Sequence, residues 1–227
     1  SEKVLYIFGK QLEEADLLVI NKCDLLDQAS LDELQQALEQ RYPGKEVLRI
    51  TAREGTGIDQ WLSILLSRSG ATADSMSVDY DRYAEGEALL GWLNLSASLS
   101  GEEFDGNNFI KDLAAAIRER LEQQQIEIAH LKMTLTPDSG NDLAVGNLVR
   151  NEGEFELSHH LVEPLEAGEL ILNLRAEGDP EILSQVIGEI VEQVTASGGL
   201  EYASNHLEAF RPGRPVPTHR LERVTED

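Results

Sequence analysis

At 227 residues, the chain is long enough to bury one large hydrophobic core or two modest ones. Its net charge of −23, from 42 acidic and 19 basic residues, repels phosphate backbones, so we expect no nonspecific binding to nucleic acid. No apolar run approaches the roughly 18 to 20 residues that span a bilayer, so we expect no membrane partner. The single cysteine excludes an internal disulfide framework and fits a reducing cytoplasm.

The first 68 residues alternate helical and strand patterns, which predicts an α/β unit with a parallel, doubly wound sheet. Leu17–Ile20 are apolar at every position, as in a strand covered on both faces. Ser30 is the predicted N-cap of the helix that follows, and Glu33 completes a capping box. Helices are also predicted over 2–15 and 57–68, and a second strand within 43–52. Because the chain starts inside a helical pattern with a serine, we expect it to be the later part of a longer protein.

The second part of the chain follows a different rhythm, in which apolar and polar residues alternate along several strands. Strand, helix, strand, strand, helix and strand is the split β-α-β arrangement of ferredoxin-like α+β folds, with extra residues between about 143 and 167. A small, polar stretch between the two parts predicts a linker. The predicted boundaries are a first domain at 1–70, a linker at 71–80, an α+β domain at 81–210 and a basic, proline-rich tail at 211–227.

Alternation in this second domain sorts its strand residues into two faces. Leucines of the first strand point to the predicted helices, and Ala129, Leu131, Met133 and Leu135 take the same face of a later strand. The opposite face then collects Trp92, Asn94, His130, Lys132, Asn173 and Arg175, with His206 at its margin. One interpretation is a solvated or domain-covered sheet face. The other is a docking face for a partner protein, because exposed aromatic residues beside arginine are typical anchors of interfaces.

Asn21, Lys22 and Asp24 stand at the carboxyl end of the first predicted strand, where open α/β sheets bind ligands. A carboxylate there can accept two parallel hydrogen bonds from a base edge that presents a ring N–H beside an exocyclic amine; guanine has this edge and adenine does not. The lysine stem can lie over the base, and the asparagine amide can tie the loop to its neighbours and contact the ring. One strand later, backbone N–H groups of Thr51 and Ala52 can contact the base carbonyl oxygen.

This spacing predicts a guanine-binding site, since Asn-Lys-x-Asp arises by chance on the order of once per 10⁴ positions. The alternative is a strand that runs into a polar turn. Asn21-Lys22-Cys23-Asp24 followed by "TAREGTG" at residues 51–57 resembles the fourth and fifth guanine-recognition motifs of P-loop GTPases. The "EGTGID" continuation resembles the CobW/HypB/UreG/MeaB group. The ending "FRPGRPVPTHR" is similar to CobW-like proteins, which carry a small α+β domain after the GTPase domain.

The resemblance implies a fold class: the carboxyl-terminal half of a doubly wound P-loop GTPase domain, followed by a ferredoxin-like α+β domain. It also implies a full-length protein that binds GTP or GDP with Mg²⁺. Such a protein couples GTP hydrolysis to delivery of a metal, such as Zn or Co, or of a cofactor to a client metalloprotein or cofactor-dependent enzyme. No G-x-x-x-x-G-K-[ST] phosphate loop is present in the chain, so we expect it to hydrolyse nothing alone. The alternative is a non-catalytic interaction module with a degenerate GTPase half.

Two other sites carry residue types that bind metals or act as nucleophiles. Cys23 occupies the variable position of its motif and is interpreted as a semi-buried structural thiol. His159 and His160 are adjacent, so on a strand they would point to opposite faces, and we expect an exposed loop pair. The sequence therefore predicts no catalytic residue and no metal ligand in this chain.

Overall fold

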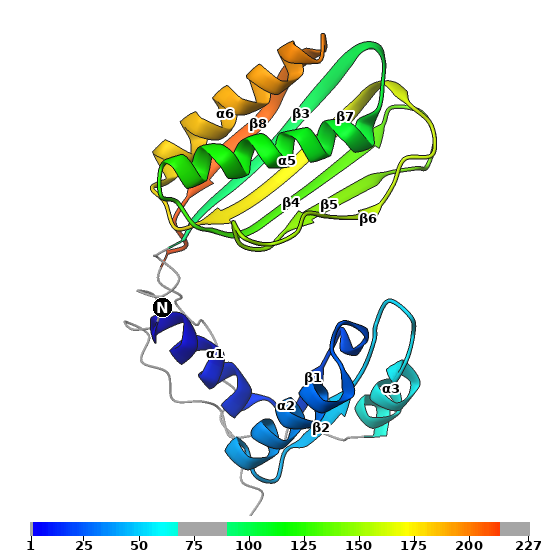
Figure 1. The fold of residues 1–227 in the computed structure, drawn as a ribbon, viewed down its shortest axis with the longest axis vertical. Coiled ribbons are helices and arrows are strands. Elements are labelled where there is room, and N and C mark those ends of the chain that lie inside the picture. Colours follow the sequence, from blue (N-terminus) through cyan, green and yellow to red (C-terminus); the bar gives the residue numbers. More distant parts are fainter. Residues whose placement is uncertain (1, 68–89, 214–227) are drawn as a thin grey trace, which may run out of the picture. The chain divides into compact units, whose positions relative to one another are not determined.

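The computed structural model describes residues 2–67 and 90–213, which fall into two compact units that are described here one at a time (Figure 1). The linker predicted at 71–80 lies outside the described residues. Of the tail predicted at 211–227, only residues 211–213 are described. Among the described helices, none has the length and apolarity needed to cross a membrane.

The first unit consists of helices around a short parallel sheet of two strands (Figure 1). The strands pair in register from Leu17 with Glu46 to Ile20 with Arg49, and a hydrogen bond of 2.9 Å from Ile50 N–H to the Ile20 carbonyl oxygen extends the pairing. Its elements are α1 (Glu2–Glu14), β1 (Leu17–Ile20), the 3₁₀ helix η1 (Cys23–Leu25), α2 (Gln28–Arg41), β2 (Glu46–Arg49) and α3 (Ile58–Ser67). The predicted alternation of helices and parallel strands is therefore present.

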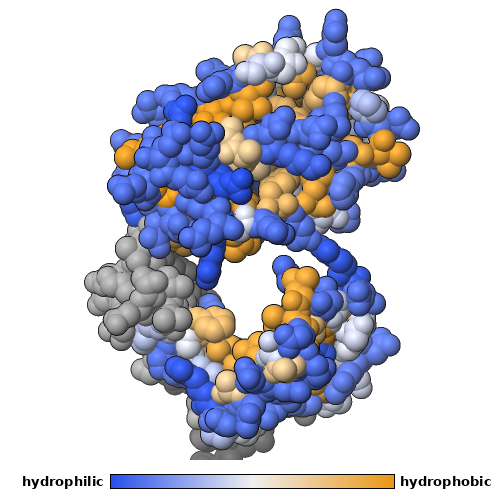
Figure 2. All heavy atoms as spheres, viewed as in Figure 1, coloured by the Kyte–Doolittle hydropathy of each residue, from blue (hydrophilic) through white to orange (hydrophobic). Residues whose placement is uncertain are grey.

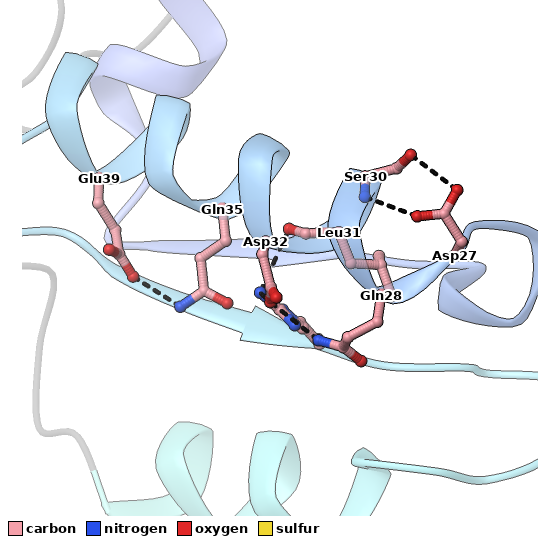
Figure 3. A network of polar contacts seen from close by, with 8 residues as sticks. Asp27, Gln28, Ser30, Leu31, Asp32, Gln35 and Glu39 are labelled. Atoms are coloured by element: carbon pink, nitrogen blue, oxygen red, sulfur yellow. Dashed lines mark hydrogen bonds and ion pairs between the residues drawn. The ribbon is translucent and has the colours of Figure 1, made fainter.

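Helix α2 begins three residues earlier than the sequence predicts, and its N-cap is Asp27 (Figure 3). The Asp27 carboxylate accepts hydrogen bonds from the Ser30 backbone N–H at 2.9 Å and from the Ser30 hydroxyl at 3.1 Å. The prediction of Ser30 as the cap is therefore wrong. Asp27 satisfies the free N–H group of the first turn at the same three-residue spacing that Ser30 would have used.

Arg49 fastens α2 to the end of β2. Its guanidinium donates to the Asp32 carboxylate at 2.8 Å and to the Leu31 backbone carbonyl oxygen at 3.2 Å. The hydrogen bonds from Arg49 and Gln28 hold the pKa of Asp32 below its ordinary value. The guanidinium therefore joins β2 to α2 at Leu31, a buried residue of this unit, and at the exposed side chain of Asp32.

The second unit is a six-stranded antiparallel sheet with two helices on one face (Figure 1). Its elements are β3 (Gly91–Phe104), α5 (Gly106–Gln123), β4 (Ile128–Pro137), β5 (Ala144–Leu148), β6 (Glu156–His159), β7 (Leu165–Ala176), α6 (Pro180–Ser197) and β8 (Glu201–Phe210). The strand order is β6-β5-β4-β7-β3-β8. Strand β7 thus lies between β3 and β4, which α5 connects, and the extra residues near 143–167 form β5 and β6.

The core of this unit lies between the sheet and the helix layer. Every second residue of β3 from Leu93 to Leu99 is buried, and helices α5 and α6 close over these residues with apolar stripes of their own. In Figure 2 the helix surfaces are mostly hydrophilic, with apolar atoms gathered between them. The largest fully buried side chains include Ile110, Leu113, Ile117, Leu121, Leu131, Met133 and Leu135. Burying this many aliphatic side chains is the main stabilising contribution to the unit.

The register shifts in four strand pairs of the described sheet, and the shifts in β8 and β4 bear on the predictions. In β8 the register shifts so that Asn205 is an extra residue, and its amide donates to the Ser98 hydroxyl at 3.0 Å. In β4 a shift between Ile128 and His130 turns Ile128 into the core in place of Ala129, which is only half-buried. The prediction that Ala129 faces the core is wrong because strict alternation does not hold across a bulge.

Candidate functional site

The predicted guanine-binding residues lie in two loops that follow β1 and β2. Because the two strands are parallel, their carboxyl ends meet at the same edge of the sheet. The backbones of the loops are tied directly, since Cys23 N–H donates to the Ile50 carbonyl oxygen at 3.2 Å. The site is therefore a pair of adjacent loops with a fixed spacing.

Asn21 joins the two loops through its side chain. Its amide oxygen accepts one hydrogen bond from Lys22 N–H at 2.8 Å and a second from Ala52 N–H at 3.1 Å. A single side chain thus satisfies one backbone donor in each loop. Asn21 thus ties the two loops together, as the sequence predicts, and its contact with the base ring stays a prediction.

Lys22 adopts a left-handed backbone conformation, with φ 61° and ψ 40°. This conformation is uncommon outside glycine and concentrates at functional turns. It folds the chain into η1, in which the Leu25 N–H donates to the Lys22 carbonyl oxygen at 3.1 Å and Asp24 occupies the first turn. The side chains of Lys22 and Asp24 are both exposed, and Asp24 has no hydrogen-bond partner within the described parts of the chain.

The second loop closes on itself. Thr51 is buried, its N–H donates to the Thr56 carbonyl oxygen at 3.0 Å, and its own carbonyl oxygen accepts from Glu54 N–H at 3.1 Å. Gly57 ends the loop at φ +77°, and a Cβ there would lie 2.6 Å from the Arg49 carbonyl oxygen. Only glycine fits this position, because both the φ angle and the close approach exclude a side chain.

The backbone N–H groups of Thr51 and Ala52 both have partners within the protein. The Thr51 N–H donates to the Thr56 carbonyl oxygen and the Ala52 N–H to the Asn21 amide oxygen. These bonds shape the second loop and tie it to the first. Contact of either N–H group with the base carbonyl oxygen stays a prediction.

Cys23 is semi-buried and both histidines are exposed, as the sequence predicts, but His159 belongs to a strand, so the prediction of a loop pair is wrong for that residue. The Cys23 thiol is half-buried and donates to the Ile20 carbonyl oxygen at 3.3 Å, as a structural thiol does. His159 ends β6, His160 follows it, and both are exposed. Within the described residues, no group of three or more histidine, cysteine, aspartate or glutamate side chains could hold a metal ion.

On the second unit, the six residues predicted for the open face line one hollow of about 310 Å³ in the sheet surface opposite the helices. Trp92 pairs with Arg175 and Asn94 with Asn173 across β3 and β7, and the Asn173 amide donates to the Asn94 amide oxygen at 2.7 Å. The hollow is lined by Trp92, Asn94, His130, Lys132, Asn173, Leu174, Arg175 and Phe210. His206 lies outside it and faces Glu208 at 3.7 Å.

The aromatic part of this hollow is built around Trp92. The Arg175 guanidinium carbon lies 3.9 Å from the Trp92 ring centroid, and the Phe210 ring lies 6.0 Å away at 45°. The indole N–H is buried without a hydrogen-bond partner among the described residues. Sequence reasoning missed Phe210, which lies opposite Trp92 where β8 pairs with β3. Counting every second residue from His206 along the same strand reaches Phe210 and could have found it.

Comparison with known proteins bears on the first unit. Residues 1–49 match the family described as CobW/HypB/UreG, nucleotide-binding domain. The predicted resemblance to CobW-like GTPases is thereby confirmed, and the match includes Asn21, Lys22 and Asp24. No curated protein matches the chain.

Two solved structures are similar to the chain at low identity. One is a Zn(II)-bound triple mutant of YjiA GTPase, with 10% identity over 85% of this chain and a TM-score of 0.29. The other is Zn(II)-bound YjiA GTPase from E. coli, with 11% identity over 83% of this chain and the same TM-score of 0.29. The chain spans a little over half of each, 56% and 55%. At this TM-score the likeness carries no argument about fold or function.

Proposed function

We propose that the first unit reads the guanine base of GTP or GDP, as part of a CobW-like GTPase. The observation that carries the proposal is the hydrogen bond of 3.1 Å from Ala52 N–H to the Asn21 amide oxygen. It locks the loop with Asn21, Lys22 and Asp24 to the loop of Thr51 and Ala52, and so gives the two predicted motifs one shared geometry. A strand that merely ran into a polar turn would need no such connection.

Each side chain has a defined task in this proposal. The exposed Asp24 carboxylate accepts hydrogen bonds from the ring N–H and exocyclic amine of guanine, and the exposed Lys22 stem covers the face of the base. Asn21 holds the loop. A site of this kind rejects adenine, because adenine would leave the carboxylate without its two donors.

The chemistry at the phosphates belongs to residues that this sequence does not contain. Mg²⁺ and a phosphate loop supply the charge stabilisation for hydrolysis of GTP, and the chain has no phosphate-loop motif. We therefore assign to this chain base recognition without hydrolysis, and to the whole protein hydrolysis of GTP with Mg²⁺. Delivery of a metal such as Zn or Co, or of a cofactor, to a client protein follows from the CobW-like resemblance.

We also infer a ferredoxin-like second domain, supported by the strand order β8-β3-β7-β4 with α5 and α6 on one face. The hollow at Trp92 favours a second function, binding of a partner protein. Guanine binding by the first unit and partner binding by the second are compatible. The alternative is an interaction module that binds no nucleotide. A preference of the chain for guanine over adenine nucleotides distinguishes the two.

The test is binding of fluorescent GDP, XDP and ADP to the protein and to its Asp24→Asn variant. We expect the unmodified protein to prefer guanine to adenine, and Asp24→Asn to weaken guanine binding by tenfold or more, on the order of 1.4 kcal/mol, while strengthening xanthine binding. Asp138→Asn, the same change in an exposed turn of the second unit, is the matched control. Unchanged base preference in Asp24→Asn would remove the assigned role of this carboxylate and leave the interaction module.

A further inference from the structure

The hollow on the open face of the second unit has a charge opposite to that of the whole chain. Its lining includes Lys132, Arg175 and the imidazole of His130, and none of its lining residues is acidic. The chain carries a net charge of −23. A basic hollow in so acidic a protein selects its ligand by charge, because a complementary segment is attracted there and repelled elsewhere.

We propose that this hollow docks an acidic segment of a partner protein, whose carboxylates pair with Arg175 and Lys132 and whose apolar side chain packs against Trp92 and Phe210. The proposal does not rest on guanine binding, because the two sites lie on different units. It names the chemistry of the partner, which the predicted docking face left undefined.

Arg175 is prepared to accept a carboxylate. Its guanidinium is stacked 3.9 Å from the Trp92 ring centroid, an arrangement that holds the guanidinium plane and leaves its N–H edges for a bidentate contact. Lys132 lies opposite Asn173 on the neighbouring strand, two positions from the Arg175 register. Within the described residues, neither Arg175 nor Lys132 forms an ion pair with a carboxylate.

The apolar side of the hollow suits an anchoring side chain. Phe210 is 36% exposed beside the half-buried Trp92. Ile171, 40% exposed, lies on the same face of β7 beyond the Asn94–Asn173 pair. Tryptophan and arginine dominate the binding energy of protein interfaces when they lie together at a centre. The Asn94–Asn173 pair adds amide groups that can bond to a peptide backbone.

The size of the hollow favours a segment of protein over a small molecule. Its volume of about 310 Å³ is at the lower limit of small-ligand pockets. It therefore accepts one or two side chains of a longer segment that continues across the sheet face. Glu208 lies on the same face beside His206, at 3.7 Å, and is not among the residues that line the hollow.

A displayed library of random twelve-residue peptides tests the proposal while the partner is still unidentified. The full chain is the target, and the Arg175→Gln, Lys132→Gln double variant is the counter-target. We expect selected peptides to be enriched in aspartate or glutamate with at least one aromatic or large aliphatic residue. Absence of enrichment, enrichment in basic peptides, or equal recovery on the double variant would each overturn the proposal.

The best synthetic peptide is then titrated against single variants by fluorescence anisotropy. Arg175→Gln and Trp92→Leu should each weaken binding by about tenfold, and Lys111→Gln, an exposed lysine on α5, should leave it unchanged. If Trp92→Leu lowers the thermal unfolding temperature, its loss of binding is not interpretable. The proposal is then judged on the affinity of Arg175→Gln alone, because the Arg175 side chain is exposed and its replacement does not disturb the core. Displacement of the peptide by succinate at equal concentration would identify a small dicarboxylate as the ligand and refute a protein segment.

Discussion

The amide oxygen of Asn21 accepts a hydrogen bond from the backbone N–H of Ala52, 31 residues further along the chain, at a distance of 3.1 Å. The 3₁₀ helix η1, helix α2 and strand β2 separate these residues in sequence, so the contact depends on the parallel pairing of β1 with β2. The loops that are proposed to read guanine are therefore positioned by tertiary structure, and neither has this geometry by itself.

Removal of the Asn21 amide should loosen the two loops without unfolding the unit. Asn21→Ala leaves two backbone donors without their acceptor, at a cost of about 0.5–1.5 kcal/mol for each hydrogen bond. We expect amide hydrogen exchange of Ala52, followed by NMR, to accelerate by about tenfold. Asn141→Ala, in an exposed turn of the second unit, is the control and should leave the exchange rate of Ala52 unchanged. An exchange rate of the Ala52 amide that stays the same in Asn21→Ala would contradict the role of Asn21 in joining the two loops.

Two glycines with the same backbone angle should respond differently to alanine. Gly55 and Gly57 both have φ +77°, but a Cβ on Gly55 meets nothing within 4 Å, whereas a Cβ on Gly57 lies 2.6 Å from the Arg49 carbonyl oxygen. Gly55→Ala should cost about 1–2 kcal/mol for the left-handed conformation alone. Gly57→Ala should cost roughly 1–3 kcal/mol more, because backbone must move.

Urea unfolding followed by Trp61 fluorescence, in a Trp92→Phe background, measures this difference in the first unit. Trp61 is the tryptophan of α3, four residues after Gly57, and reports on the neighbouring structure. Equal midpoints for the two alanine variants would show that the Arg49 carbonyl oxygen moves aside at no cost.

Acidification should weaken the first unit through Asp32 and Asp27. The hydrogen bond from Arg49 lowers the pKa of Asp32, and that from the Ser30 backbone lowers the pKa of Asp27, from the ordinary value of 3.8. A lowered pKa in the folded state contributes stability that is present above the unfolded-state pKa and is lost as the pH falls below it. Thermal unfolding should therefore occur at lower temperature at about pH 3 than at about pH 5.

Asp32→Asn isolates the part of this pH dependence that belongs to the Arg49 pair. The variant should be less stable above about pH 4 and should change less between the two pH values, since its side chain does not titrate. Asp59→Asn, in the exposed first turn of α3, is the control. A pH dependence identical to that of the unmodified protein would exclude Asp32 as a contributor.

The asparagine at the start of α5 should matter more than its neighbour. Asn107 donates to the Leu161 carbonyl oxygen and accepts from the Leu161 N–H, both at 2.9 Å, so it satisfies a buried backbone unit 54 residues away. Asn107→Ala should destabilise the second unit by about 1–3 kcal/mol. Asn108→Ala, which loses only an exposed bond to Asp105, should cost less; calorimetry compares the two.

Most elements of both units could be predicted from the sequence because their signals are local. Consecutive apolar residues mark β1, and two-residue alternation marks β3 and β7, so the residues of the Trp92 hollow could be chosen before their contacts were known. Ser30 was misassigned because Asp27 offers the same capping chemistry three residues earlier, and Gln28 and Ala29 carry no apolar signal. Strand β6 was missed because it is short and follows a loop.

The candidate site was predictable in its residue types but only partly in its bonding. Asn21 was expected to connect loops, and it does. Which backbone donors are consumed inside the protein depends on the closed turn from Thr51 to Thr56 and could not be derived from spacing. Likewise, the stacking of Arg175 on Trp92 follows from strand register, which alternation suggests but does not fix.

Asn205, the extra residue in β8, also affects the tendency of this protein to aggregate. In the described part of the chain β8 and β6 are the outer strands of the sheet, and outer strands offer unpaired backbone groups to other molecules. The bulge at Asn205 interrupts the regular backbone of β8, so another strand cannot pair along its full length. At the other border, β6 is only four residues long and offers few backbone groups for pairing. Deletion of Asn205 would straighten the border at β8 and should promote fibrous or amorphous aggregation during storage.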